Sequence, residues 1–368
     1  MTSRQRLLAA MRRQDVDRVP LHVRGVNFWD ERWVQTRHPS YAPVIEAVRE
    51  HGDPFIGWGA GGGVLLTSSD EVRLESETQP GEDWNEQVTA MHTPRGPLTA
   101  RHLASNRGLP GMQTEHFVKD LDDLDKVLAV PCEPLRPDVR GFSELQDQIG
   151  ERGLVTCDFA NPITHLHDLV GSELLAIWSL TERNAVRSFI HTWAERLGDL
   201  IRYLLDQGVG PVFRTLGHEF AIPPLMSPRD FGEFCIEPEA PIHGMIHEAG
   251  GLVHIHCHGP MDKVLEGFVA IGCDCLHPIE PPPMGDVELA DAKRRVGDRL
   301  CLEGNLQIGD LYAAPTEEVV AKTRAAVRDG GPTGFILCPT ASPHTEVLTD
   351  LTVRNYLAMI NTAAGGRA

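Results

Sequence analysis

The fold is decided by the stretch Gly251-Leu252-Val253-His254-Ile255-His256-Cys257-His258-Gly259, in which apolar residues alternate with three histidines. Strict alternation over so few residues predicts a β-strand. Because successive side chains of a strand point to opposite faces, the three histidines are expected to share one face. Val253, Ile255 and Cys257 are then expected on the other face.

The segments on either side of this strand predict helices. Residues 239–250 end in glycine, which is typical of a helix carboxyl terminus, and residues 261–270 follow the strand. Helix–strand–helix order is the unit of a parallel α/β fold, whose chemistry lies at the carboxyl ends of the strands. His256 and His258 stand at such an end and are the first candidates for a site. A metal site and direct hydrogen bonding to a substrate are both open interpretations of this pair.

The same rhythm continues along the chain. Further strands are expected at residues 20–26, 53–59, 153–159, 210–216, 273–279, 300–303 and 334–338. About eight parallel strands, each leading to a helix, predict an α/β fold of the (β/α)8 TIM-barrel class, with residues 1–368 as a single domain. Residues 72–103 alternate differently around the turn Pro94-Arg95-Gly96-Pro97 and predict a β-hairpin insertion near the N-terminus.

Composition narrows the class of protein. Hydrophobic residues make up 41% of the 368 residues, enough for a globular core, and the formal net charge is −18. This acidity argues against a nucleic-acid partner, which needs a basic surface. No apolar run approaches the roughly 20 residues of a membrane helix, and the N-terminus lacks a signal-peptide pattern, so a cytoplasmic location is expected. The eight cysteines form no Cys-x-x-Cys pair and are expected to be mostly buried thiols.

Polar residues at the predicted strand ends are the candidate site residues, because the strand ends of a closed barrel meet at one mouth. We predict catalytic roles for Glu219, His256 and Asn305. We predict substrate binding by Arg24, Trp29, Trp33, Asp158, His277 and Glu280. Cys338 also stands at a strand end. The tryptophans, with Phe28, could form an aromatic wall for a flat substrate; ordinary packing is the equal alternative.

Several motifs together resemble the uroporphyrinogen decarboxylase superfamily over nearly the whole chain. They are Arg6-Leu-Leu-Ala-Ala-Met11, Asp17-Arg-Val-Pro20, Leu225-Met-Ser-Pro-Arg-Asp-Phe231, His256-x-His258-Gly259, Glu303-Gly-Asn305 and Gly334-Phe-Ile-Leu337. The resemblance implies a single barrel domain. The superfamily contains tetrapyrrole decarboxylases and corrinoid-dependent methyltransferases.

Departures from the family patterns separate these branches. The decarboxylases carry Met-Arg-Gln-Ala-Gly-Arg after the first strand, where this chain has His22-Val-Arg24-Gly-Val-Asn27 and keeps only one arginine. They also carry Gly-His-Gly near the C-terminus, where this chain has Thr340-Ala341-Ser342. The thiol-methylating branch holds zinc with His-x-Cys-Gly and a distant cysteine. Those positions are His256-x-His258-Gly259 and Ala341 here, with Cys338 and His344 nearby.

The chain is more similar to the demethylating, O-demethylase-type methyltransferases, which pass a methyl group from a methyl ether or methylated amine to a corrinoid protein. This branch holds zinc with two glutamates and a histidine. The resemblance implies His258 and Glu237 as ligands, which match the family spacing, and Glu219 as the first carboxylate. The spacing between the two glutamates is longer than the pattern, and His256 is a substitute for either. Cys257, expected on the opposite face, is not predicted as a ligand.

The function implied by the resemblance is removal of a methyl group from a small substrate, with methoxylated aromatics favoured, and its transfer to a corrinoid (cobalamin). Zinc would activate the leaving oxygen. The corrinoid is expected on a partner protein, with no nucleic-acid or membrane partner, and a homodimer is left open. The alternatives are a decarboxylase, another metal-dependent lyase or hydrolase on the same barrel, and a non-catalytic protein that binds a small molecule.

Overall fold

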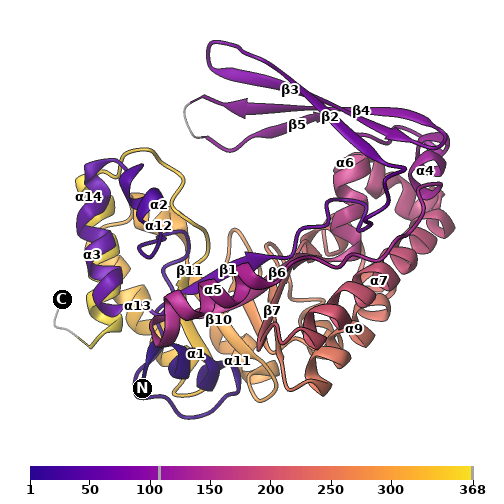
Figure 1. Cartoon of the computed structure of the whole chain (residues 1–368). Helices are drawn as coiled ribbons and strands as arrows, with labels where there is room; N and C mark the ends of the chain where they lie inside the picture. Colours follow the sequence, from indigo (N-terminus) through magenta and orange to yellow (C-terminus); the bar gives the residue numbers. More distant parts are fainter. Residues whose placement is uncertain (107–108, 366–368) are drawn as a thin grey trace.

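The computed structural model describes residues 1–106 and 109–365. Its centre is a curled sheet of seven parallel strands, which Figure 1 shows surrounded by helices. In spatial order the strands are β1 (Phe55–Gly59), β6 (Leu154–Ala160), β7 (Val212–Leu216), β8 (Leu252–His256), β9 (Cys275–Ile279), β10 (Cys301–Leu306) and β11 (Phe335–Pro339). The spatial order follows the chain order, as in a sheet that winds in one direction.

The predicted first strand, residues 20–26, is reduced to a single bridge. Leu21 pairs in parallel with Leu337 of β11. On its other side Leu21 accepts the Asp53 backbone N–H at 2.6 Å and donates its own N–H to the Asp53 carboxylate at 3.0 Å. Leu21 therefore links the two edge regions of the sheet. The chain turns directly afterwards at Gly25, whose φ of +78° is unsuited to a strand, so no eighth strand is formed among the described residues.

Helices alternate with the strands and cover the outside of the sheet. They are α1 (Ser3–Met11), α2 (Glu31–Gln35), α3 (Ala42–His51), α4 (Leu121–Leu128), α5 (Arg140–Ile149), α6 (Pro162–Thr181), α7 (Arg183–Asp206), α8 (Pro228–Phe231), α9 (Glu237–Glu248), α10 (Leu265–Ala270), α11 (Leu289–Val296), α12 (Ile308–Ala313), α13 (Thr316–Gly330) and α14 (Asp350–Ala363). The described structure also has short 3-10 helices, η1 (Pro39–Tyr41), η2 (Gly150–Arg152) and η3 (His218–Ala221), and a π-helical segment, η4 (Gly232–Ile236). The predicted helix 261–270 begins only at Leu265.

An apolar floor closes the amino-terminal end of the curled sheet. Each of the seven strands contributes one residue to this buried cluster: Phe55, Leu154, Val212, Leu252, Cys275, Cys301 and Ile336. Leu7, Ala10 and Met11 of α1 pack against them from below. Since α1 seals this end, the polar groups further along the strands can face only the carboxyl end.

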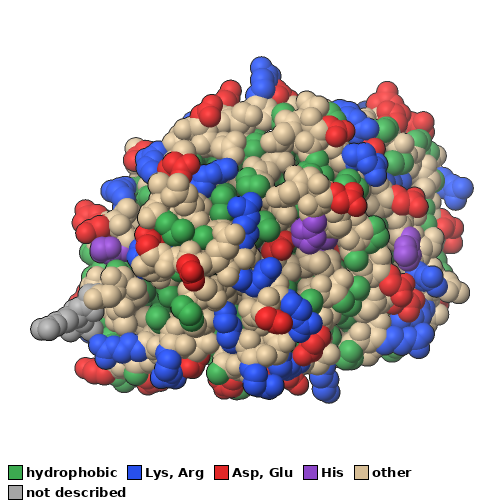
Figure 2. Space-filling model, turned by 90° about the horizontal axis from the view of Figure 1, so that it is seen from below, with side chains coloured by type: hydrophobic (Ala, Val, Ile, Leu, Met, Phe, Trp, Pro, Cys, Tyr) green, Lys and Arg blue, Asp and Glu red, His purple; other side chains and the backbone are tan. Residues whose placement is uncertain are grey.

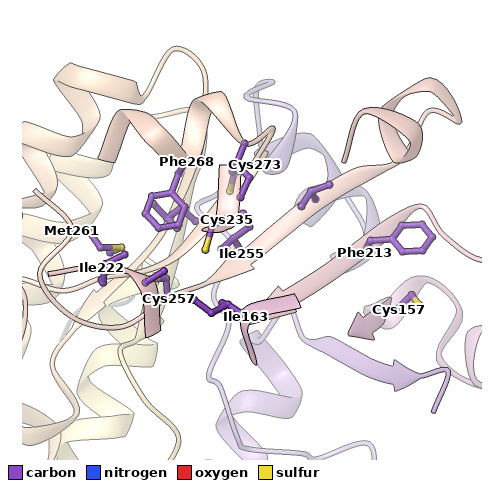
Figure 3. Close-up of a cluster of buried hydrophobic side chains, with 14 of the residues drawn as sticks. Cys157, Ile163, Phe213, Ile222, Cys235, Ile255, Cys257, Met261, Phe268 and Cys273 are labelled. Atoms are coloured by element: carbon purple, nitrogen blue, oxygen red, sulfur yellow. The ribbon is translucent and has the colours of Figure 1, made fainter. Parts of the chain in front are cut away.

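The opposite face of β8 belongs to the main core between sheet and helices. Figure 3 shows Ile255 and Cys257 there, with Ile222, Met261 and Phe268 around them. Leu252, in contrast, lies in the inner floor. The predicted alternation of β8 is thus confirmed, and Cys257 is separated from the histidines of the same strand.

A second sheet is antiparallel and projects from the rest of the molecule (Figure 1). It consists of β2 (Arg73–Gln79), β3 (Trp84–Thr93), β4 (Gly96–Ser105) and β5 (Met112–Glu115). The insertion predicted for residues 72–103 is therefore a four-stranded sheet and extends to residue 115. Its β2 strand is exposed over its whole length, and the polar β5 carries too few apolar residues for a strand signal.

No helix in the described part of the chain is both long and apolar enough to cross a membrane. Figure 2 shows the molecule from below, with acidic and basic side chains interspersed over that face. The side chains drawn on that face form no continuous basic patch, in keeping with the net charge of −18.

Candidate active site

A buried carboxylate, Glu303 of β10, lies directly above the apolar floor. His22 Nδ1 lies 2.6 Å from its Oε1 and His254 Nε2 lies 2.6 Å from its Oε2. Because an ionised carboxylate only accepts hydrogen bonds, both imidazoles donate. Burial alone would raise the pKa of Glu303, but the electrostatic interactions with His277, His22 and His254 and the hydrogen bond from His22 outweigh burial and hold that pKa well below its usual range. Burial lowers the pKa of His22. Both neighbours thus favour an anionic Glu303.

His256 and His277 form the next pair along the interior. Their Nδ1 atoms lie 2.8 Å apart, and both side chains are buried. Burial is the main reason that the pKa of each histidine lies well below 6.5, and for His256 the neighbouring His277 lowers it further. Two neutral imidazoles therefore share this contact.

His258 lies beyond the end of β8, at the mouth of the curled sheet. Its Nδ1 is 3.2 Å from Glu280 Oε2, and the side chain is 38% exposed. Glu280 is itself buried and accepts the backbone N–H of Gly259 at 2.9 Å. The imidazole of His256 lies 4.6 Å from that of His258, centre to centre. The structure therefore brings together four of the predicted residues, His256, His258, His277 and Glu280.

A cavity of about 720 Å³ opens beside this group. His258, Glu280 and Asn305 line one end of it. Much of the remaining lining is apolar, with Pro281, Pro282, Pro283, Met284, Leu306 and Ile308 among its residues. The charged residues Glu288, Asp310, Lys322 and Asp329 line it as well. A largely apolar cavity with a few convergent polar groups is the usual form of a small-molecule site.

Two arginines lie near the interior, Arg214 on β7 and Arg24 in the turn after the Leu21 bridge. Arg214 of β7 forms an ion pair with Asp158 of β6, and Asp158 also accepts the Thr156 hydroxyl at 2.6 Å. A side chain at Gly57 of β1 would collide with this ion pair. Arg24 forms no ion pair among the described residues. Burial, with nearby Arg214, lowers the pKa of Arg24, whose guanidinium still stays charged at neutral pH.

The two glutamates predicted as metal ligands have different surroundings. Glu219 lies in η3, and its Oε2 is buried with no hydrogen-bond partner in the described structure. Glu237 is exposed in the first turn of α9, and no contact with either histidine is found. The prediction of Glu237 as a ligand is not supported, because the residue faces solvent. The buried carboxylate of that helix is Glu239, bound by His218 at 3.0 Å and Asn161 at 3.0 Å.

The predicted aromatic wall is not part of the cavity lining. Trp33 packs edge to face with Tyr41 and lies under the guanidinium of Arg37. Trp29 packs against Phe28. All three predicted aromatics are half-buried against the main core, so the packing interpretation describes their observed contacts better.

Sequence reasoning missed His22, Arg214 and, as a central group, Glu303. Each is a polar residue within an otherwise apolar strand or bridge, on the face that points inward. The alternation of β10 could have indicated Glu303, because Cys301 and Glu303 share a face. His22 carried no such signal, since its partner is 281 residues away.

The fold and this site define the molecule as a parallel α/β protein with its polar groups at the carboxyl ends of the strands. The family described as uroporphyrinogen decarboxylase (URO-D) matches residues 104–365, more than two thirds of the chain. The chain belongs to this family, which has a TIM-barrel fold, as the resemblance implied.

Curated relatives are matched over shorter segments. The uroporphyrinogen decarboxylase of Aeromonas salmonicida is 34% identical over 113 residues, which are 29% of this chain and 30% of that protein. The enzyme of the same name from Colwellia psychrerythraea is 28% identical over 172 residues, or 44% and 45% of the two chains. The matches thus span less than half the length of these relatives.

One solved structure aligns with almost the whole chain. The structure of a methyltransferase from Methanosarcina mazei aligns with 99% of this chain and 99% of its own, with a TM-score of 0.64 and 17% sequence identity. At this identity the likeness shows a shared fold.

Proposed function

We propose that this protein is a methyltransferase that removes a methyl group from a small methylated substrate and passes it to a corrinoid. The acceptor would be a corrinoid protein, and a methoxylated aromatic is the favoured donor. The observation that carries the proposal is the group His256, His258 and Glu280 beside a largely apolar cavity of about 720 Å³. A flat aromatic ether fits such a cavity, and its oxygen can reach the polar end.

Two of the residues present, His258 and Glu280, are spaced as two ligands of a zinc ion with open positions. Two ligands at about 2.0 Å from a tetrahedral zinc lie about 3.3 Å apart. His258 Nδ1 and Glu280 Oε2 already lie 3.2 Å apart. The low pKa of His256 keeps its imidazole neutral, which is the form that binds metal. Zinc would be held first by His258 and Glu280. The ligand atoms of His256, His258 and Glu280 do not all lie within 4.8 Å of one another in the described structure, so the His256 side chain would have to move to become the third ligand. The unpartnered buried oxygen of Glu219 makes that residue a further candidate.

Bound zinc supplies Lewis acidity toward the ether oxygen, which is otherwise a poor leaving group. The protein itself binds and orients the substrate. Asn305 lines the same end of the cavity and can donate a hydrogen bond to a substrate oxygen. The proline loop 281–283 forms a rigid wall. No nucleophile is required from this chain, because the methyl acceptor would be the cobalt of the corrinoid.

Arg24 is assigned to an anionic group of the substrate. Its guanidinium lies in the interior without an ion pair among the described residues, whereas Arg214 is already paired with Asp158. A carboxylate on the aromatic ring would supply the missing charge.

The test is a methyl-transfer assay with zinc analysis. Purified protein is incubated with cob(I)alamin and a panel of methoxylated aromatics, and methylcobalamin is measured. Wild-type protein should contain zinc and form methylcobalamin, and His258→Ala or Glu280→Ala should lose zinc and at least about 100-fold in rate. His92→Ala, which alters an exposed histidine of β3, is the matched control and should retain both. Full activity after exhaustive chelation would remove zinc from the proposal.

A decarboxylase is the second candidate, because the curated relatives carry that name and two arginines lie near the interior. Tetrapyrroles with many carboxylates need more cations than these two. Incubation with uroporphyrinogen separates the candidates: release of carbon dioxide, with no methylcobalamin formed in the other assay, would establish the decarboxylase instead.

A further inference from the structure

The contact between His256 and His277 can hold only one proton. The Nδ1 atoms are 2.8 Å apart, the ring planes differ by 19° and the centroids are 5.0 Å apart. The two imidazoles therefore meet at their Nδ1 edges in nearly the same plane. One Nδ1 must carry a hydrogen and donate it, and the other must accept.

The far side of His277 decides which ring donates. Its Nε2 lies 3.4 Å from the backbone oxygen of Pro339 and 3.4 Å from Cys338 Sγ. A carbonyl oxygen only accepts. The Cys338 thiol can either donate or accept, so it is compatible with both tautomers. The carbonyl of Pro339 requires a hydrogen on His277 Nε2, and a neutral His277 then has a bare Nδ1.

We propose that His277 is a positioning residue that fixes His256 in the Nδ1–H tautomer. His256 donates its Nδ1 hydrogen to His277, so its Nε2 carries a lone pair. No described residue hydrogen-bonds His256 Nε2. The inference rests on the proposed function only in assigning this nitrogen to zinc. It adds the reason that His256 Nε2 carries a lone pair available to a metal.

The arrangement is an unusual form of a common device. A histidine that binds zinc generally donates its other N–H to a carboxylate, a carbonyl or water, which fixes the tautomer and the ring orientation. Here a second histidine accepts that hydrogen, and the carbonyl of Pro339 in β11 holds the second histidine in turn. The tautomer of His256 is thereby set by the protein alone, before any metal binds.

The test is histidine tautomer spectroscopy on the full chain. Protein labelled with 15N-histidine is studied by long-range 1H–15N correlation before and after chelation, and the His256 signals are identified as those missing in His256→Asn. Nδ1–H is expected in both samples. His243, whose Nδ1 lies 2.7 Å from the Ile271 oxygen, provides a buried Nδ1–H reference in the same spectrum. An Nε2–H or doubly protonated His256 after chelation would overturn the proposal.

Two substitutions separate positioning from simple packing. In His277→Asn an amide oxygen can still accept from His256, so the Nδ1–H tautomer should persist. In His277→Leu the acceptor is gone, so the tautomers should mix and zinc affinity should fall about 10- to 100-fold. An unchanged tautomer and unchanged zinc affinity in His277→Leu would rule out the role. Absence of methyl transfer by the wild-type protein would instead count against the proposed function, because the tautomer measurement requires neither substrate nor corrinoid.

Discussion

Two histidine–glutamate pairs combine the same two side chains, one pair in the buried interior and the other on the exposed surface. His22 and Glu303 meet at 2.6 Å inside the curled sheet, with side chains that are 6% and 1% exposed. His92 and Glu75 meet at 3.2 Å on the projecting antiparallel sheet, where they are 41% and 56% exposed. Water screens the second pair and can replace either partner. Water cannot reach the first, so each partner depends on the other.

The difference between the two pairs indicates where the loss of a charged side chain should lower the stability of this protein. An exposed ion pair contributes little to stability, typically about 0–1 kcal/mol. Removing one partner of a buried pair typically costs about 3–5 kcal/mol, because the other partner is left desolvated. The many charged residues of β2–β5 are therefore expected to tolerate substitution, and the few inside the parallel sheet are not.

The largest expected effect is the loss of stability in acid. Burial lowers the pKa of His165 to about 4 and also lowers those of His22 and His243, so the folded state resists protonation. Below pH 6.5 the unfolded chain binds more protons, so stability is fully present above pH 6.5 and is lost as the pH falls. His165 alone accounts for about 3 kcal/mol between pH 6.5 and pH 4, and the lowered pKa values of His22 and His243 add to this loss.

Urea unfolding at pH 7.5, 6 and 5 measures this loss. His165→Asn removes one titrating group and should give a shallower pH dependence than the wild type. A free energy of unfolding that stays constant from pH 7.5 to pH 5 would contradict the assignment of neutral buried histidines. His247, which is exposed and is held by Asp274, has a raised pKa and acts in the opposite direction.

The second effect concerns the buried carboxylate directly. Glu303→Ala leaves His22 and His254 without their shared acceptor and should lower the free energy of unfolding by about 3–5 kcal/mol at pH 7.5. Glu75→Ala removes the exposed counterpart and should change it by less than about 1 kcal/mol. Equal effects from the two substitutions would show that burial does not separate the two pairs.

The smallest effect should appear in substrate binding alone. Arg24→Met removes an interior cation that has no ion pair among the described residues, so stability should be unchanged or slightly higher. A substrate with a carboxylate should bind about 10- to 100-fold more weakly, as expected for a lost charged hydrogen bond of about 1.5–3 kcal/mol. The KM of a neutral methyl ether should not change. An equal loss of affinity for the carboxylate substrate and the neutral ether would contradict the assignment of Arg24 to a substrate carboxylate.

Local pattern determined much of the fold. Alternation around His254 and His256 predicted both faces of β8, since side-chain direction in a strand depends only on neighbouring residues. The helix predicted at residues 239–250 is observed as α9, Glu237–Glu248, because helix ends depend on residues within a few positions. The same reasoning failed at residues 20–26, where strand-like composition met the turn at Gly25 and formed only the bridge at Leu21.

The sequence by itself also determined which residues are candidates at the strand ends, and the family to which the chain belongs. Only the tertiary structure decided which of them meet. Glu280, 22 positions along the chain from His258, became its carboxylate partner, while the predicted Glu237 faces solvent. His277 meets His256 across neighbouring strands, and Glu303 gathers His22 and His254 from 281 and 49 residues away. Such contacts depend on how the sheet curls and how its strands align, and no local periodicity carries that information.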